Sequence, residues 1–286
     1  MPVSLGFCCR RIGTAARSTA LVITVLSVDQ LSAVHQLLDQ ISDRQRLDFG
    51  NIGSDVKPDG TLITACDRWS DATFAAGLEQ IYPDDGLLSE EGSTAVPQTS
   101  CCWVVDPLDG TTNFSVGLPI WAISLARFEA GRPLEAVLDV PPLRQRYVAV
   151  RGQGVWRDGE RLSPPGGPRH GCSCASLCTR SLPVIQQLPQ RFPAKTRMLG
   201  VASLNLLGVG LGTMLAALEA TPKIWDLAGV WLMLDELGCI IRPLADDPFP
   251  LQPGAPLGEA SYPLLAACNE AQYQRFLPWG EALLKR

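Results

Sequence analysis

The sequence predicts a layered protein of mixed class, α+β in its first half and α/β in its second. Three observations predict it. Apolar residues recur at helical spacing over 28–49, short apolar segments separated by turns follow one another over 120–156, and strand-like and helix-like segments alternate in the last third. At 286 residues the chain can bury a large core, as two lobes or as one large unit.

The composition is that of a globular protein, with 46% hydrophobic and 19% charged residues. The net charge is −5, from 24 basic and 29 acidic residues, and no basic run is present. Nucleic acid is therefore not expected as the main partner. No apolar run has the length of a membrane span, so no membrane partner is expected either.

The chain contains 10 cysteines. Those in apolar runs, such as Cys66, Cys102 and Cys268, are expected to be buried reduced thiols. A second group lies in a segment rich in proline and glycine, where a zinc site is an alternative although the spacing matches no common zinc pattern. No credible secretory signal is present, so a reducing cytoplasm is expected. The second group consists of His170, Cys172, Cys174 and Cys178.

Residues 1–27 have an unusual composition. Arg10, Arg11 and Arg17 occur before any acidic residue, and the short apolar run Ala20–Leu26 follows them. This resembles a weak targeting peptide, but no small-residue cleavage site follows the run. We expect a disordered leader or an overextended start.

The first elements follow from periodicity and caps. Val28–Phe49 is an amphipathic helix, Thr61–Thr64 is a short strand, and a second helix runs over Asp67–Ile81. Asp67 either complements the dipole of this helix or is an acid aimed at a metal-bound water. Glu90 and Glu91 end a short apolar run, where paired glutamates are usually solvated.

The segment Cys101–Phe114 is the centre of the prediction. An apolar strand over 101–105 meets Asp106 and Pro107, and proline is expected to end its hydrogen-bonded ladder. Asp109 follows Asp106 by three residues, and Gly110 makes a turn before two threonine hydroxyls. Such oxygen ligands suit Mg²⁺, although a surface turn would have the same composition. The spacing excludes the phosphatases that use an Asp-x-Asp-x-Thr nucleophile.

An antiparallel meander is expected next, over 120–128, 134–140, 146–151 and 152–156. The Pro/Gly-rich loop 157–171 is expected to separate an N-terminal α+β lobe, 28–156, from a C-terminal α/β lobe, 157–286.

The second half alternates between helices and strands. Helices are expected at 182–188, from Gly200 to 212, from Trp225 to Leu237 and over 270–285, with strands at 196–199, 214–219, 239–243 and 264–269. Asp226 lies at a helix start, where capping is its simple role and metal binding the alternative.

Four motifs occur in a fixed order, and together they resemble the inositol monophosphatase family within the Mg²⁺-dependent, lithium-sensitive phosphatase superfamily. The resemblance covers about 28–280. It implies an αβαβα sandwich of the sugar-phosphatase type, with most metal ligands in the first lobe and substrate contacts in the second. It also implies a homodimer. The motifs are Lys57–Gly60 with Thr64–Asp67, then Glu90–Glu91, Asp106–Phe114 and Trp225–Gly229.

The resemblance implies a role for each matching residue. It implies two or three Mg²⁺ ions, with Mn²⁺ as an alternative ion. It implies that Asp67 and Thr111 orient and activate the attacking water, and that Glu90 takes part in catalysis as well as in metal binding. The implied metal ligands are Glu90, Asp106, the Leu108 carbonyl, Asp109 and Asp226. The implied phosphate and substrate contacts are Gly110, Thr111, Thr112, Gly200, Ala202 and Glu219.

The implied activity is hydrolysis of a small polyol or sugar phosphate by a metal-activated water, with myo-inositol monophosphate as the leading substrate. Fructose 1,6-bisphosphate and histidinol phosphate are alternatives, and Lys223 beside the substrate region leaves a more acidic substrate open. A substrate-side serine of the family has no assigned position in 170–181. A non-catalytic regulatory protein is the third alternative, although such a protein is expected to lose acids that this chain retains.

Overall fold

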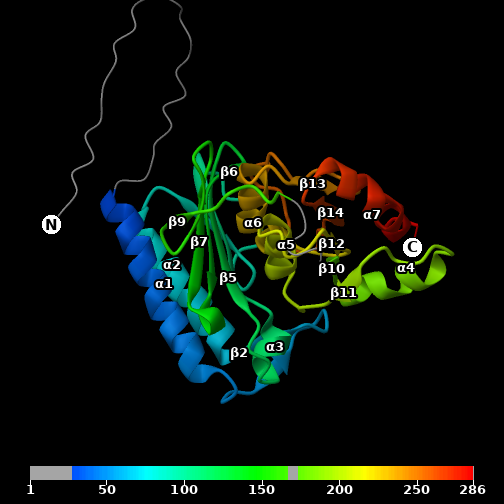
Figure 1. Ribbon diagram of the computed structural model, residues 1–286. Helices are drawn as coiled ribbons and strands as arrows, with labels where there is room; N and C mark the ends of the chain where they lie inside the picture. Colours follow the sequence, from blue (N-terminus) through cyan, green and yellow to red (C-terminus); the bar gives the residue numbers. More distant parts are fainter. Residues whose placement is uncertain (1–27, 167–172, 286) are drawn as a thin grey trace, which may run out of the picture.

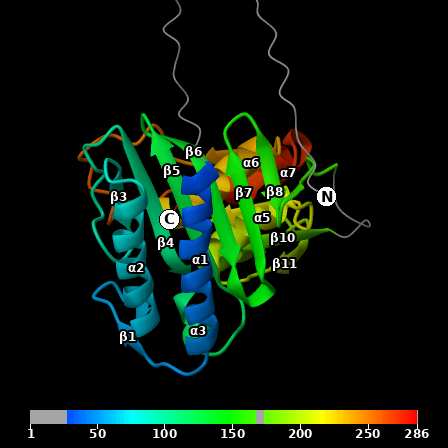
Figure 2. The same cartoon turned by 90° about the vertical axis from the view of Figure 1, so that its left-hand side faces the viewer.

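A computed structural model describes residues 28–166 and 173–285. The elements form five layers, helix, sheet, helix, sheet and helix, which confirms the expected sandwich (Figure 1). Helices α1 (Val28–Asp48) and α2 (Ala65–Ile81) cover one face of the larger sheet (Figure 2). Helices α5 (Ala202–Gly210) and α6 (Ile224–Glu236) lie between the two sheets, and α7 (Glu270–Leu283) covers the far side of the smaller one.

The larger sheet has seven strands in the order β3-β4-β5-β6-β7-β8-β9. Its neighbours pair antiparallel except for β3 and β4, which are parallel. Because helices cover both faces, the central strands are buried along nearly their whole length rather than at alternate residues. The strands are β3 (Gly86–Ser89), β4 (Cys101–Asp109), β5 (Ala122–Glu129), β6 (Arg132–Val140), β7 (Gln145–Val150), β8 (Gly154–Arg157) and β9 (Glu160–Arg161).

The smaller sheet has five strands in the order β11-β10-β12-β14-β13. Strand β10 runs parallel to β11 and β12, whereas β14 runs antiparallel to β12 and β13. A separate hairpin joins β1 and β2. The strands are β1 (Ser54–Val56), β2 (Leu62–Thr64), β10 (Cys174–Leu177), β11 (Lys195–Arg197), β12 (Ala216–Glu219), β13 (Ile240–Pro243) and β14 (Leu264–Ala267).

Helix α6 is apolar on all sides because it is enclosed by the two sheets. Gly229 allows its close approach to β5, since a Cβ at this position would lie 3.1 Å from the Ser124 hydroxyl. This packing brings the first turn of α6 to the end of β4. Within residues 28–166 and 173–285, the shorter helical segments are α3 (Thr111–Ser115), α4 (Leu182–Gln187) and the 3₁₀ turns η1 (Pro141–Leu143) and η3 (Thr179–Ser181).

Most expected elements are present within a few residues of their predicted bounds, but four expectations were wrong. The loop expected over 157–171 contains the short strand β9, which pairs with β8. Strand β4 does not end at Pro107, because its pairing resumes at Asp109 after a shift of register. Helix α2 begins at Ala65 rather than at Asp67, because Thr64 caps it. Strand β10 occupies Cys174–Leu177, where no helix or strand was expected.

Some predictions concern residues outside the described part of the chain, namely the leader 1–27 and the zinc alternative at His170 and Cys172. Within the described part, the Cys178 Sγ lies 3.2 Å from the Ser181 hydroxyl and 3.2 Å from the Ala220 amide. No helix in 28–166 or 173–285 has the length and apolar character needed to cross a bilayer. The division into two lobes stays a prediction, and the largest buried cluster includes residues on both sides of 157.

Candidate metal centre

A bulge in β4 turns two aspartates toward the same side of the sheet. Asp106 pairs with Ser124 and Asp109 with Ala122, so three steps along β4 match two along β5. In a regular strand, residues three apart point to opposite faces, and one extra residue reverses that parity. The Asp106 Oδ1 accepts a hydrogen bond from the Leu108 N–H at 3.0 Å, which stabilises the bulge.

A third carboxylate comes from α6. Asp226 is the third residue of this helix, and its Oδ2 accepts from the Lys223 N–H at 2.7 Å. Asp226 therefore caps the helix, which was the simple expectation, and its carboxylate also lies close to the two aspartates of the bulge. One carboxylate oxygen from each of Asp106, Asp109 and Asp226 lies within 4.8 Å of the others, the only such group found in the described residues.

Burial and mutual repulsion make this cluster costly without a cation. Burial raises the pKa of Asp106 and of Asp226 well above the ordinary value, and neighbouring carboxylates raise both further. Burial also raises the pKa of Asp109, to about 6, although hydrogen bonds from Ser203 and Ala202 oppose the shift. A hard divalent cation would neutralise these charges and satisfy their oxygens, so the donor set fits Mg²⁺.

Glu90 reaches the same cavity from the end of β3. This cavity has a volume of about 640 Å³. The Lys57 ammonium bridges the two glutamates, with its Nζ 2.9 Å from Glu90 Oε1 and 2.5 Å from Glu91 Oε1. Burial lowers the pKa of Lys57, but the two carboxylates outweigh it and raise that pKa above the ordinary value. Lys57 therefore holds Glu90 beside the aspartates as a charged pair.

Asp67 and Thr111, both predicted to act in catalysis, form a hydrogen-bonded pair. The Thr111 hydroxyl lies 2.8 Å from Asp67 Oδ1 and 3.2 Å from the Leu108 carbonyl oxygen. The other Asp67 oxygen accepts from the Thr64 N–H at 2.9 Å, which closes the capping box of α2. Asp67 is almost fully buried, and its hydrogen bonds hold the carboxylate in one orientation. This orientation is compatible with both roles expected from the sequence, a charge at the start of α2 and an acid aimed at a metal-bound water.

Gly110 makes the turn from β4 into α3. Its φ is 108°, and a Cβ there would lie 2.8 Å from a Val201 methyl group, so glycine is required on two counts. The first N–H groups of a helix have no partner within it. The amides of Thr111 and Thr112 open α3 and have no partner within this helix, so their predicted role in binding a phosphate stays a prediction.

An adjoining cavity of about 480 Å³ shares Asp109, Gly200 and Asp226 with the first. Of the predicted substrate residues, Gly110 and Thr111 line only the first cavity, Ala202 and Glu219 only the second, and Thr112 and Gly200 line both. Glu219 is buried there and accepts from the Asn205 side chain at 2.8 Å. Burial raises the pKa of Glu219 to about 8, against that hydrogen bond. The Ala202 amide instead faces Asp109 at 3.3 Å.

The sequence did not reveal three residues of this site. Ser203 donates its N–H and its hydroxyl to Asp109 Oδ2, at 2.8 and 2.6 Å. Its position in the first turn of a predicted helix was the available signal. Arg180 lines both cavities, and the Gln45 side chain donates to the Pro107 carbonyl at 2.7 Å. In the segment expected to supply a serine, Cys178, Thr179 and Arg180 are the polar residues that line the cavity.

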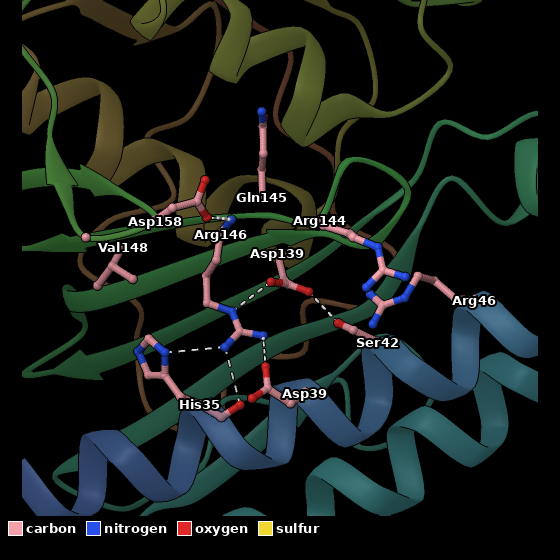
Figure 3. Close-up of a pocket in the computed structure, with 11 residues that line it drawn as sticks. His35, Asp39, Ser42, Arg46, Asp139, Arg144, Gln145, Arg146, Val148 and Asp158 are labelled. Carbon is pink, nitrogen blue, oxygen red and sulfur yellow. Dashed lines mark hydrogen bonds and ion pairs between the residues drawn. The ribbon is translucent and has the colours of Figure 1, made fainter.

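Another cavity, of about 390 Å³, lies between α1 and strands β6 and β7 (Figure 3). None of the predicted site residues lines it. Arg146 forms its centre and bonds to Asp139 at 2.7 Å and to Asp39 at 2.8 Å. Burial lowers the pKa of His35, and the charge of Arg146 adds to that effect. These groups largely satisfy one another and attach α1 to the sheet.

Comparison with known proteins identifies the family. A sequence model of the inositol monophosphatase family matches residues 23–275. The histidinol-phosphatase of Mycobacterium tuberculosis is 32% identical over 225 residues, which cover 74% of this chain and 86% of that protein. The fructose-1,6-bisphosphatase/inositol-1-monophosphatase of Thermotoga maritima is 27% identical, over 75% of this chain and 84% of that protein.

A third relative carries a different kind of name. The putative Nus factor SuhB of Neisseria meningitidis is 31% identical, over 68% of this chain and 78% of that protein.

Solved structures share the fold. The Thermotoga maritima IMPase superposes with a TM-score of 0.75 at 23% identity, over 90% of this chain and 99% of that one. An IMPase/NADP phosphatase complexed with Mg²⁺ and phosphate superposes with a TM-score of 0.73 at 25% identity, over 88% of this chain and 94% of that one. The family model over residues 23–275 and the relative at 32% identity show that the chain belongs to the inositol monophosphatase family and is by class a phosphoric monoester hydrolase.

Proposed function

We propose that this protein is a Mg²⁺-dependent phosphatase for a small polyol or sugar phosphate, with myo-inositol monophosphate as the first candidate substrate. The observation that carries the proposal is the group of three carboxylates within 4.8 Å, next to the hydrogen-bonded pair of Asp67 and Thr111. The Thr-Thr-Asn-Phe sequence after Gly110 favours the inositol-phosphate branch of the superfamily.

In this proposal the acids of the bulge and of α6 hold two or three Mg²⁺ ions, and Mn²⁺ can replace them. When bound, the ions neutralise the phosphate and lower the pKa of a coordinated water. The protein's own part is to place the oxygens on one side of the cleft, through the bulge at Pro107. The ligands are Glu90, Asp106, the Leu108 carbonyl, Asp109 and Asp226.

Asp67 and Thr111 act on the attacking water. The Thr111 hydroxyl donates to Asp67, so the lone pairs of the Thr111 oxygen remain available to accept a hydrogen bond from a water in the cavity. Asp67 can then take a proton through this contact. Glu90 is the second carboxylate in reach of that water, held by Lys57.

The substrate is held at both ends. The backbone around Gly110, Thr111 and Thr112 receives the phosphate, and Gly200, Ala202 and Glu219 receive the hydroxyl-bearing part. Supporting this, Gly200 and Glu219 line the cavity that continues from the carboxylate group.

Phosphate release with Mg²⁺ from a panel of substrates tests the proposal. The panel contains myo-inositol 1-phosphate, fructose 1,6-bisphosphate, histidinol phosphate and adenosine 3′,5′-bisphosphate, each with and without a chelator. We expect the highest kcat/KM on the inositol phosphate and no release with the chelator. If metal-dependent release is fastest from another compound, that compound takes the place of myo-inositol monophosphate as the proposed substrate. If no compound releases phosphate, the proposed function is wrong.

Two alternative substrates come from relatives. The names histidinol-phosphatase and fructose-1,6-bisphosphatase/inositol-1-monophosphatase keep histidinol phosphate and fructose 1,6-bisphosphate in the panel. A regulatory role, for which the Nus factor relatives are the reason, is disfavoured because the acids converge on one cavity. A cytoplasmic homodimer with separate α+β and α/β lobes stays part of the proposal.

A further inference from the structure

Gln45 is a fully buried amide at the back of the metal centre. It lies on α1, a helix whose sequence pattern points only to packing. Its Nε2 donates to the Pro107 carbonyl at 2.7 Å and lies 3.3 Å from the Ser70 hydroxyl, and its Oε1 accepts from the Trp121 indole N–H at 3.0 Å. The side chain thus joins α1, α2, the β4 bulge and the residue before β5.

These bonds leave the amide one orientation. If the amide turned over, its NH₂ would face the indole N–H and its oxygen would face the Pro107 carbonyl, so both contacts would become repulsive. The indole is itself held in place, because its ring packs 4.6 Å from the Phe49 ring and 5.0 Å from the Phe114 ring. The donor to Pro107 is therefore built in.

The direction of the Pro107 carbonyl bears on the next carbonyl. Pro107 lies inside the bulge, where the regular ladder with β5 is interrupted and no strand partner fixes the peptide. Gln45 holds the Pro107 oxygen toward α1, while the Leu108 oxygen lies 3.2 Å from the Thr111 hydroxyl, in the cavity. The bond from Gln45 thereby replaces the strand hydrogen bond that the Pro107 carbonyl lacks. The orientation of this peptide in turn decides which way the next carbonyl, that of Leu108, points.

We propose that Gln45 is a positioning residue that sets the Leu108 carbonyl and the two bulge aspartates for metal binding. The inference rests on the proposed metal centre but not on the identity of the substrate. Gln45 also contacts Ser70, one turn after Asp67, so it keeps the water-activating helix α2 in register with the metal ligands. It touches neither substrate nor metal.

The test measures Mg²⁺ affinity directly, by titration calorimetry of the whole protein without substrate. Gln45→Met keeps the length of the side chain but removes both the donor and the acceptor. We expect Mg²⁺ affinity to fall about 10-fold to 100-fold, the range for loss of a partner that orients metal ligands. Ser42→Ala is the control on the same helix: Ser42 is buried, donates to Asp139 and does not contact the bulge. It should lower the melting temperature and leave Mg²⁺ affinity within twofold.

A second variant separates positioning from stability. Gln45→Glu keeps the acceptor for Trp121, but an ionised carboxylate cannot donate to Pro107, whereas the protonated acid can. The Mg²⁺ affinity of this variant should therefore approach that of wild type as pH falls from 7.5 to 5.5. The measured quantity is the ratio of the two affinities at each pH. A cavity or a general loss of stability would give a ratio that does not follow pH in this way.

The outcomes are distinct. Gln45→Met binding Mg²⁺ like wild type, or Ser42→Ala losing as much affinity, would overturn the role of Gln45. If Gln45→Met does not fold, Trp121→Phe decides, because it removes the indole donor that orients the Gln45 amide, and unchanged Mg²⁺ affinity in this variant overturns the proposal. Wild-type protein that binds no Mg²⁺ would instead contradict the metal centre itself.

Discussion

Two charged cavities adjoin the seven-stranded sheet, and their charge balance differs. The cavity beside α1 is lined by three aspartates, Asp39, Asp139 and Asp158, and by three arginines, Arg46, Arg144 and Arg146. The cavity at the β4 bulge is lined by six acids and three bases. Its acids are Asp59, Glu90, Asp106, Asp109, Asp226 and Glu259, and its bases are Lys57, Arg180 and Lys223.

The difference separates a structural role from a functional one. Beside α1, Arg146 is bonded to two aspartates, and the cavity is lined by equal numbers of aspartates and arginines, so their charges balance without a ligand from solution. At the bulge, the acids exceed the bases and three of them meet within 4.8 Å; burial, and to a lesser extent neighbouring carboxylates, raise their pKa values. Buried carboxylates of this kind are stabilised either by protonation or by a cation, so this cavity is the one that suits a cationic ligand.

The largest effect is expected from Asp109→Asn. It removes one anionic ligand from the proposed metal centre. Loss of several kcal/mol of metal-dependent stabilisation corresponds to a loss of about 10³-fold in kcat/KM. The metal-free protein should stay folded, because a repulsive buried charge is lost. Phosphate release and thermal unfolding with a chelator measure the two effects. Near-normal turnover would remove Asp109 from the metal ligands.

The converse substitution breaks the balanced cavity. Asp139→Ala leaves Arg146 and the Ser42 hydroxyl without their main partner, and loss of one member of a buried pair costs about 3 kcal/mol. Urea unfolding should show this loss, whereas Mg²⁺ affinity of the folded protein should not change. A fall in Mg²⁺ affinity with no loss of stability would reverse the roles assigned to the two cavities.

Thr111→Val tests the catalytic half of the bulge cavity. It removes the hydroxyl between Asp67 and the Leu108 carbonyl while keeping the shape of the side chain. We expect kcat to fall about 10²-fold, the usual size for a lost proton-transfer contact. Mg²⁺ affinity should stay close to that of wild type, and Thr111→Ser should recover most of the activity. Equal kcat for Thr111→Val and wild type would exclude the proton path.

The smallest effect concerns pH and the metal-free protein. Burial raises the pKa of Glu219 to about 8 and that of Glu91 to about 7, both above the ordinary value of 4.5. The folded state therefore binds more protons than the unfolded state, and stability is lost as pH rises through these values. The lowered pKa of His35 acts in the opposite sense only below its ordinary value of 6.5.

Between pH 6.5 and 8, with a chelator present, urea unfolding should show a loss of about 1–2 kcal/mol. Mg²⁺ should reduce this slope, because it stabilises ionised neighbours. A metal-free protein that gains stability over this range would show that the excess of acids is not buried as described.

Local patterns were sufficient for much of the fold. The helical periodicity at the start, the turn-separated strands of the meander and the glycine stop after α6 depend on neighbours in sequence, and the structure has these elements. The motifs were sufficient for the acids of the site, since Asp106, Asp109 and Asp226 are characteristic in type and spacing. Their convergence matches the expectation, while their roles stay predictions.

Contacts between distant segments decided the rest. The end of β4 was predicted from proline chemistry, but pairing with β5 carries the strand past Pro107 and creates the bulge that turns both aspartates the same way. Gln45 has no local signal of function and Ser203 has only its place in the first turn of a helix, because each contacts the site through a partner 62 or 94 residues away. The sequence by itself determined which oxygens are available to a cation, since residue type and order are local properties. Only the tertiary structure decided which way they point, since orientation depends on strand register and on packing against α1 and α6.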